Sequence, residues 1–132
     1  MTITVGTELP PFTAPPISRL TLALFAGASG DHNPIHVDLD AAKLAGVPDV
    51  FAHGMLSMAY LGRLLTRWVP QEDIRSLSAR FTAITPVHGQ PTCQGTVVSV
   101  DEVDGELGEA AFAGKFAGQH GSQQSRIDVA AG

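Results

Sequence analysis

A helical period of hydrophobic positions marks the first half of the chain. Residues 19–28 predict a helix that Ser18 caps at its N-terminus. The apolar and small positions that share one face of this helix are Leu20, Ala23, Leu24 and Gly27. A short helix over residues 41–45, capped by Asp40, is expected next. The proline-rich stretch 1–18 is expected to be extended, because proline cannot donate to a sheet ladder.

The longest helical pattern covers residues 55–69 and is apolar around most of its circumference. Such a helix has to be enclosed by the rest of the fold. After this helix, hydrophobic and polar residues alternate with a period of two, which predicts a half-buried strand over residues 76–83. Residues 91–103 and 106–117 predict two more strands, joined through Asp104-Gly105, a typical hairpin turn. Helices followed by antiparallel strands indicate an α+β domain.

Composition and charge narrow the classes of protein. The chain has 132 residues, 44% hydrophobic and 16% charged, which fits a single globular domain over residues 1–132. Residues 119–132 are expected to be a polar tail or a weak edge strand. The net charge of -5 argues against nucleic acid or an anionic membrane as partner.

Cysteine usage and apolar runs bear on the compartment. The single cysteine, Cys93, can form neither an internal disulfide nor a cysteine-based metal site. The apolar runs are interrupted by Arg, Gly or Pro, so no membrane span is expected. A cysteine-poor chain without a signal-like segment is expected to be cytoplasmic.

The candidate chemistry concentrates in the segment from Gly30 to His36. Asp31 and His36 lie five positions apart. Pro34 fixes its own φ and keeps Asn33 out of the α region, so the segment is a bent loop and not a helix. A carboxylate and an imidazole presented toward a common point can act as an acid–base pair. Such residues are also typical of turns, so an ordinary turn followed by a half-buried His36 remains a second interpretation.

A zinc site is a third interpretation, because His32 and His36 are four positions apart. Pro34 and Gly30 forbid the helix that such a pair needs, and no glutamate follows His32. The sequence therefore predicts no metal. The glycines between Gly27 and Gly30 also lack the lysine and the spacing of a phosphate-binding loop.

The segment from Phe25 to His36, followed by Ala52-His53-Gly54-Met55, resembles the signature of the MaoC-like, or R-specific, enoyl-CoA hydratases. That signature is an aromatic residue, a small-residue step and Gly-Asp-x-Asn-Pro-aliphatic-His. Every fixed position of it is present here. The second box follows at the expected distance and opens the long apolar helix. The resemblance implies the hot-dog fold, a curved antiparallel sheet wrapped around a long central helix.

The resemblance also implies an activity. It is the reversible syn hydration of trans-2-enoyl-CoA to (R)-3-hydroxyacyl-CoA, or the reverse dehydration, within fatty acid metabolism. Asp31 and His36 would hold the water between them. Asn33 and Pro34 would brace the loop without taking part in proton transfer. No cofactor is implied, because the substrate is carried as a coenzyme A or acyl-carrier thioester.

The second box supplies further candidate residues. The Gly54 N–H, at a helix start, would stabilise the oxyanion, although this glycine could instead serve close packing. His53 is interpreted as structural. The acyl chain is expected to run beside the long helix, where Ser57, Ala59 and Gly62 leave room.

Two other functions remain open. One is the catalytic subunit of a heterodimeric 3-hydroxyacyl-thioester dehydratase that acts on acyl carrier protein or coenzyme A. The other, less favoured, is a hot-dog acyl-CoA thioesterase, which typically works with a lone carboxylate. A homodimer is expected, or a heterodimer with a related hot-dog subunit, because a short chain offers few strands to cover an apolar helix.

Overall fold

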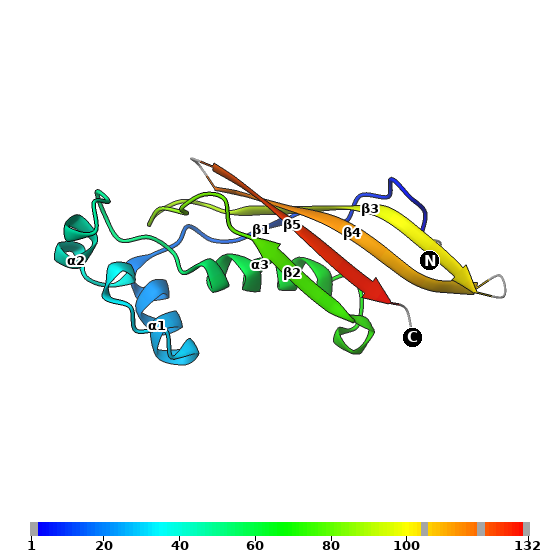
Figure 1. Ribbon diagram of the computed structural model, residues 1–132, viewed down its shortest axis with the longest axis horizontal. Helices are drawn as coiled ribbons and strands as arrows, with labels where there is room; N and C mark the ends of the chain where they lie inside the picture. The colour runs from blue at the N-terminus through cyan, green and yellow to red at the C-terminus, as the bar shows by residue number, and fades with distance from the viewer. Residues whose placement is uncertain (1–2, 104–105, 119–120, 131–132) are drawn as a thin grey trace.

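An antiparallel sheet with one long helix against its face forms the body of the protein (Figure 1). The computed structural model describes residues 3–103, 106–118 and 121–130. The helices are α1 (Arg19–Ser29), α2 (Leu39–Leu44) and α3 (Gly54–Thr66), with 3-10 turns η1 (Pro34–His36) and η2 (Gln71–Asp73). The strands are β1 (Phe12–Thr13), β2 (Ser76–Arg80), β3 (Thr92–Val103), β4 (Glu106–Gly118) and β5 (Gly121–Ala130).

The strand order is β1-β3-β4-β5-β2, and every neighbouring pair is antiparallel. β3 and β4 are the long predicted hairpin strands, although the turn expected at Asp104-Gly105 lies outside the described residues. Residues 119–132 were expected to be a polar tail or a weak edge strand. β5 instead lies inside the sheet, paired with β4 on one side and β2 on the other, so the edge placement is wrong. This strand is internal because its backbone pairs with a neighbour on each side. Its polar sequence does not predict an internal position.

α3 packs into two hydrophobic cores, which explains its apolar circumference. Leu61, Leu64 and Leu65 join the core under the sheet, with Cys93 and Val97 of β3. Near the start of α3, Leu56 belongs to a second core with residues of α1, α2 and the loops, among them Leu22, Ala42 and Val50. One helix thus ties the sheet to the helical end of the molecule, where α1 and α2 lie together (Figure 1).

The two shorter helices differ from the prediction in detail. α1 begins at the predicted cap, where the Ser18 hydroxyl accepts the Thr21 N–H at 3.0 Å. Its buried residues are Leu22 and Ala26. The apolar positions Leu20 and Leu24 are instead 67% and 64% exposed.

α2 starts earlier than expected. Its N-cap is Asp38, whose carboxylate accepts the N–H groups of Asp40 and Ala41, so the prediction of Asp40 as the cap is wrong. Asp38 has the extended backbone that a cap needs. Asp40 instead lies in the first turn, where its negative charge interacts favourably with the positive end of the helix dipole. Within the described ranges, none of the helices has both the length and the apolar character that crossing a bilayer requires.

Candidate active site

The candidate site lies where the loop after α1 meets the start of α3. Gly30 ends α1 with a left-handed φ of 77°, and its N–H donates to the Ala26 carbonyl at 3.1 Å. Pro34 opens η1, and the Asn33 side-chain oxygen accepts the Ile35 N–H at 3.3 Å. Glycine permits the positive φ and proline blocks a longer helix, as the sequence predicts. The segment is therefore a bent loop.

This bend brings Asp31 and His36 together. Each offers one side-chain atom within 4.8 Å of the other. Asp31 is exposed, whereas His36 is only 7% exposed. Groups at this separation can share one water, because a hydrogen bond to water is about 2.8 Å long. The Asp31 carboxylate also accepts the Asn33 N–H at 3.2 Å, which ties the acid to the turn.

The His36 ring is held in one orientation by a backbone carbonyl. Its Nδ1 lies 2.7 Å from the Phe51 oxygen. A carbonyl can only accept, so Nδ1 carries the proton and Nε2 keeps the lone pair in the neutral ring. The Phe51 ring also meets His36 edge-on, with centroids 4.9 Å apart. Nε2 is therefore the nitrogen available to act as a base.

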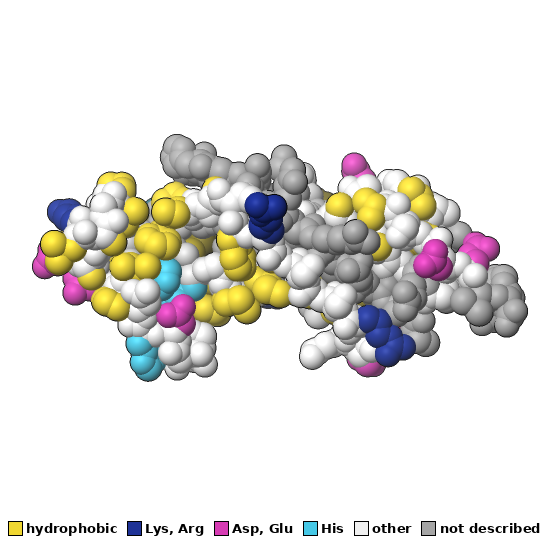
Figure 2. All heavy atoms as spheres, viewed as in Figure 1, with side chains coloured by type: hydrophobic (Ala, Val, Ile, Leu, Met, Phe, Trp, Pro, Cys, Tyr) yellow, Lys and Arg dark blue, Asp and Glu magenta, His cyan; other side chains and the backbone are white. Residues whose placement is uncertain are grey.

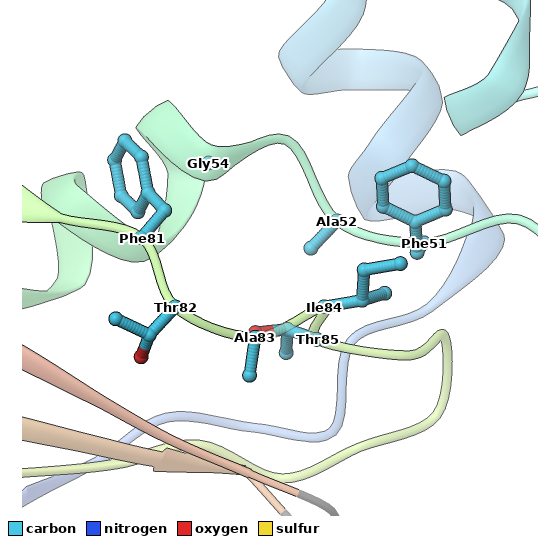
Figure 3. Close-up of a pocket in the computed structure, with 8 residues that line it drawn as sticks. All are labelled: Phe51, Ala52, Gly54, Phe81, Thr82, Ala83, Ile84 and Thr85. Atoms are coloured by element: carbon cyan, nitrogen blue, oxygen red, sulfur yellow. The ribbon is translucent and has the colours of Figure 1, made fainter.

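Gly54 is the first residue of α3 and lines a cavity of about 450 Å³, with Phe51, Ala52 and residues 81–85 (Figure 3). The first N–H groups of a helix have no carbonyl partner within it and lie at its positive end. The Phe81 ring lies beside Gly54, and a Cβ at position 54 would sit 3.1 Å from two ring carbons. Close packing therefore accounts for a glycine here. The oxyanion role is compatible with it and remains a prediction.

An apolar groove of about 500 Å³ runs beside α3 on the Asp31 side. Ala59 and Gly62 line it, together with Asp31 and apolar side chains from α1, α3 and β2. Ser57, also expected at the groove, is 1% exposed and is not among the residues that line it. It lies two positions before Ala59, roughly 200° away around the helix. Figure 2 shows histidine and acidic side chains among hydrophobic ones on the half of the surface that carries α1 and α2.

His53, which the sequence interpretation takes as structural, lies directly against the acid–base pair. It is fully buried, at 0% exposure, and its ring stacks on His36 with centroids 3.9 Å apart. Its Nε2 lies 3.3 Å from the backbone oxygen of Asp31. Burial lowers the pKa of His53, and repulsion from His36, when that ring is protonated, lowers it further. Its place directly before Gly54, in the second box, was the available signal.

Asp31, His36 and His53 together offer three potential metal ligands, one atom each, within 4.8 Å of one another. The stacked His36 and His53 rings are only 27° from parallel. The lone pair of an imidazole nitrogen lies in the plane of its ring. The lone pairs of the two stacked histidines therefore point along nearly parallel planes and do not converge. A tetrahedral ion needs them to converge at about 2.0–2.1 Å. The donor set therefore fits a metal poorly without movement of a ring.

Comparison with known proteins agrees with the family resemblance of the sequence. The model of the MaoC-like domain family matches residues 4–113. The 3-hydroxyacyl-thioester dehydratase Y of Mycobacterium tuberculosis is 33% identical over 110 residues, which cover 80% of this chain and 36% of that protein. The peroxisomal enoyl-CoA hydratase 2 of Arabidopsis thaliana is 35% identical over 68 residues, 48% of this chain and 22% of that protein. The chain thus spans well under half the length of these two relatives.

Among solved structures, the R-hydratase PhaJ1 of Pseudomonas aeruginosa is similar with a TM-score of 0.83 and 25% sequence identity. The superposition covers 98% of this chain and 82% of that one. The predicted α+β hot-dog fold is confirmed.

The lowered pKa of His53 predicts a pH dependence of stability. Below an ordinary histidine pKa of about 6.5, the unfolded chain binds a proton that folded His53 resists. The free energy of unfolding should therefore fall as the pH drops from about 7 to about 5. Urea unfolding across this range should give a flatter profile for His53→Gln than for the unmodified chain. Equal slopes for the two proteins would contradict a lowered pKa of His53. His32→Gln, which changes an exposed histidine, is the control.

Proposed function

Because this chain belongs to the MaoC-like domain family, we propose that it catalyses the reversible hydration of a trans-2-enoyl thioester to an (R)-3-hydroxyacyl thioester. The observation that carries the proposal is the Asp31 carboxylate and the His36 imidazole, with side-chain atoms within 4.8 Å, beside an apolar groove. The relatives named for enoyl-CoA hydration and 3-hydroxyacyl-thioester dehydration catalyse the two directions of this reaction. The chain is accordingly assigned as a hydro-lyase.

Asp31 and His36 hold one water between them. One member of the pair takes a proton from the water, and the water oxygen forms a bond to C3 of the substrate. The C2=C3 π electrons move toward the thioester oxygen and give an enolate. The same pair returns the proton to C2. Because the oxygen and the proton arrive from one side, the addition is syn, and the dehydration reverses each step.

Gly54 supplies the donor for the enolate oxygen. Its N–H belongs to the first turn of α3, a helix of 13 residues whose N-terminal end favours negative charge. Preorganised backbone donors of this kind stabilise a developing oxyanion strongly, because they need no reorganisation during the reaction. Asn33 and Pro34 support the loop and exchange no protons.

The acyl chain occupies the groove beside α3. Asp31 and apolar side chains line the same groove, so the acid lies against the space in which the chain would run. Gly62 leaves room there, since a Cβ at this position would meet only the Leu77 Cδ2 atom, at 3.8 Å. The substrate brings its own activating thioester, so the reaction uses no cofactor and no metal.

Two alternatives share these residues. The chain could be the catalytic subunit of a heterodimeric 3-hydroxyacyl-thioester dehydratase, on coenzyme A or acyl carrier protein. The chemistry would be the same and the partner and carrier would differ. A thioesterase is favoured less, because His36 beside Asp31 is not needed by a lone-carboxylate hydrolase. Hydrolysis would release free thiol, which a thiol reagent detects in the same assay.

The chain acts as a dimer, most simply a homodimer. Leu20 and Leu24 of α1 and Met55 of α3 are large apolar side chains that are 67%, 64% and 55% exposed, and Met55 also lines the groove. A two-fold pair is the commonest closed assembly that covers such a surface. Light scattering at about 10 µM should give twice the mass of the chain. Monomer mass with full activity would contradict this proposal.

Removal of either member of the acid–base pair should abolish most of the activity. Asp31→Asn keeps the size of the side chain and removes its charge, and His36→Ala removes the imidazole. We expect the hydration rate to fall roughly 10²–10⁴-fold in each, which is about 3–5 kcal/mol of barrier. Because both groups act on one water, the double variant should be hardly slower than either single one.

The assay follows the enoyl-thioester absorbance, with thermal unfolding measured on the same samples. Asp40→Asn, which removes an exposed carboxylate on α2, is the matched control and should keep full activity. If the ordinary-turn interpretation were correct, the Asp31 and His36 variants would unfold at lower temperature and keep full turnover per folded molecule.

Gly62→Leu should shorten the preferred acyl chain. The new side chain would fill the groove, so kcat/KM for an eight-carbon enoyl-CoA should fall roughly tenfold or more, while that for crotonyl-CoA should stay within about twofold. Thr66→Leu adds the same side chain at an exposed position of α3 and is the control. Equal losses for short and long substrates would mean that the acyl chain binds elsewhere or that the packing of α3 is disturbed.

A further inference from the structure

His53 has no part in the proton transfers described above, yet it is the most enclosed titratable side chain of the site. It is 0% exposed, while His36 is 7% exposed and Asp31 is on the surface. The ring lies between two others, with the Phe25 ring edge-on at 4.9 Å and the His36 ring stacked at 3.9 Å. A polar ring is costly to bury, so this placement calls for an explanation.

The hydrogen bond of His53, the N-cap residue of α3, crosses to the loop that carries Asp31. Its Nε2 is 3.3 Å from the backbone oxygen of Asp31, 22 residues away along the chain. The carbonyl can only accept, so Nε2 carries the proton and donates. Other hydrogen bonds of Asp31 join it to Ser29 and Asn33, each two positions away. Such local bonds shape the loop but cannot fix its distance from α3, whereas the bond from His53 can.

The other nitrogen of His53 bears on its charge. Nδ1 is buried and has no hydrogen-bond partner within the described residues. A proton there would have no acceptor among them, and burial together with repulsion from a protonated His36 lowers the pKa of His53. Among the described residues, the titratable groups that face it are His36, which stacks on the ring, and Asp31, whose backbone bond and charge raise the pKa of His53 without reversing the shift. The ring is therefore neutral and donates through Nε2 alone.

We propose that His53 is a positioning residue that holds the Asp31 backbone and the His36 ring at a fixed distance from the start of α3. One ring contacts both members of the acid–base pair, and it directly precedes Gly54 in the sequence. It thereby fixes the position of Asp31 and His36 relative to the N-terminus of α3, which would stabilise the enolate charge. The inference rests on the proposed hydratase function and deepens it, because the separation of base and oxyanion donor would depend on this side chain.

Two substitutions separate the hydrogen bond from the packing. His53→Phe keeps a ring that can stack and removes the donor. His53→Gln keeps a donor near the position of Nε2 and removes the ring. We expect kcat of the Phe variant to fall about 10–100-fold, because small displacements of catalytic groups are costly. KM should change little, because the new ring keeps the packing against Phe25, which lines the groove. The Gln variant should recover most of kcat, and His32→Gln, on the exposed side of the loop, should match the unmodified chain.

The outcomes distinguish this inference from the function on which it rests. If the unmodified chain hydrates no enoyl thioester, the proposed function fails. If it does, Asp31→Asn is inactive and His53→Phe is fully active, only the positioning role is overturned. Equal losses of kcat in the Phe and Gln variants, with both folded, would also overturn it, because packing alone would then explain His53.

A measurement without substrate covers the case in which the variants fail to fold. ¹⁵N NMR of the imidazole nitrogens in the unmodified chain should show His53 neutral near pH 7, with its proton on Nε2. A charged ring, or a proton on Nδ1, would overturn the proposal whatever the activities are.

Discussion

The burial of α3 in two cores is the constraint on which the site depends. Leu61, Leu64 and Leu65 hold the helix against the sheet, and Leu56 holds its first turns against α1 and α2. Full burial of side chains of this size stabilises a fold by about 1.5–3 kcal/mol each. The start of the helix is thereby fixed relative to the loop that carries Asp31 and His36. In the proposed function, the acid–base pair lies near the start of this helix and the groove for the acyl chain lies along its side.

The local sequence predicts the chemical loop well because its determinants are local. Gly30 permits a positive φ, Pro34 stops the helix because it fixes φ and has no N–H to donate, and the Asn33 side chain closes the turn by accepting the Ile35 N–H. The pairing of Asp31 with His36 follows from that bend. The order of the elements also follows from the change of hydrophobic period, which is a property of each segment alone.

What the sequence could not predict depends on contacts between distant segments. The polar strand β5 lies inside the sheet because β2 and β4 both pair with it. Neither pairing can be predicted from the amino-acid composition of the strand. The buried side of α1 is set by the second core and includes Leu22, whereas Leu20 remains exposed. His53 contacts the loop through a hydrogen bond to a carbonyl 22 residues away and through a stacked ring, and no local sequence pattern predicts either contact.

The central claim is that one acid–base pair delivers water and proton to the same face of an enoyl thioester. It is tested most directly by hydrating crotonyl-CoA in D₂O with the purified chain and determining the configuration at C2 and C3 of the product by NMR. The account predicts an (R)-3-hydroxybutyryl thioester with deuterium and hydroxyl added syn. An (S) product, anti addition, or release of free thiol in place of hydration would contradict it.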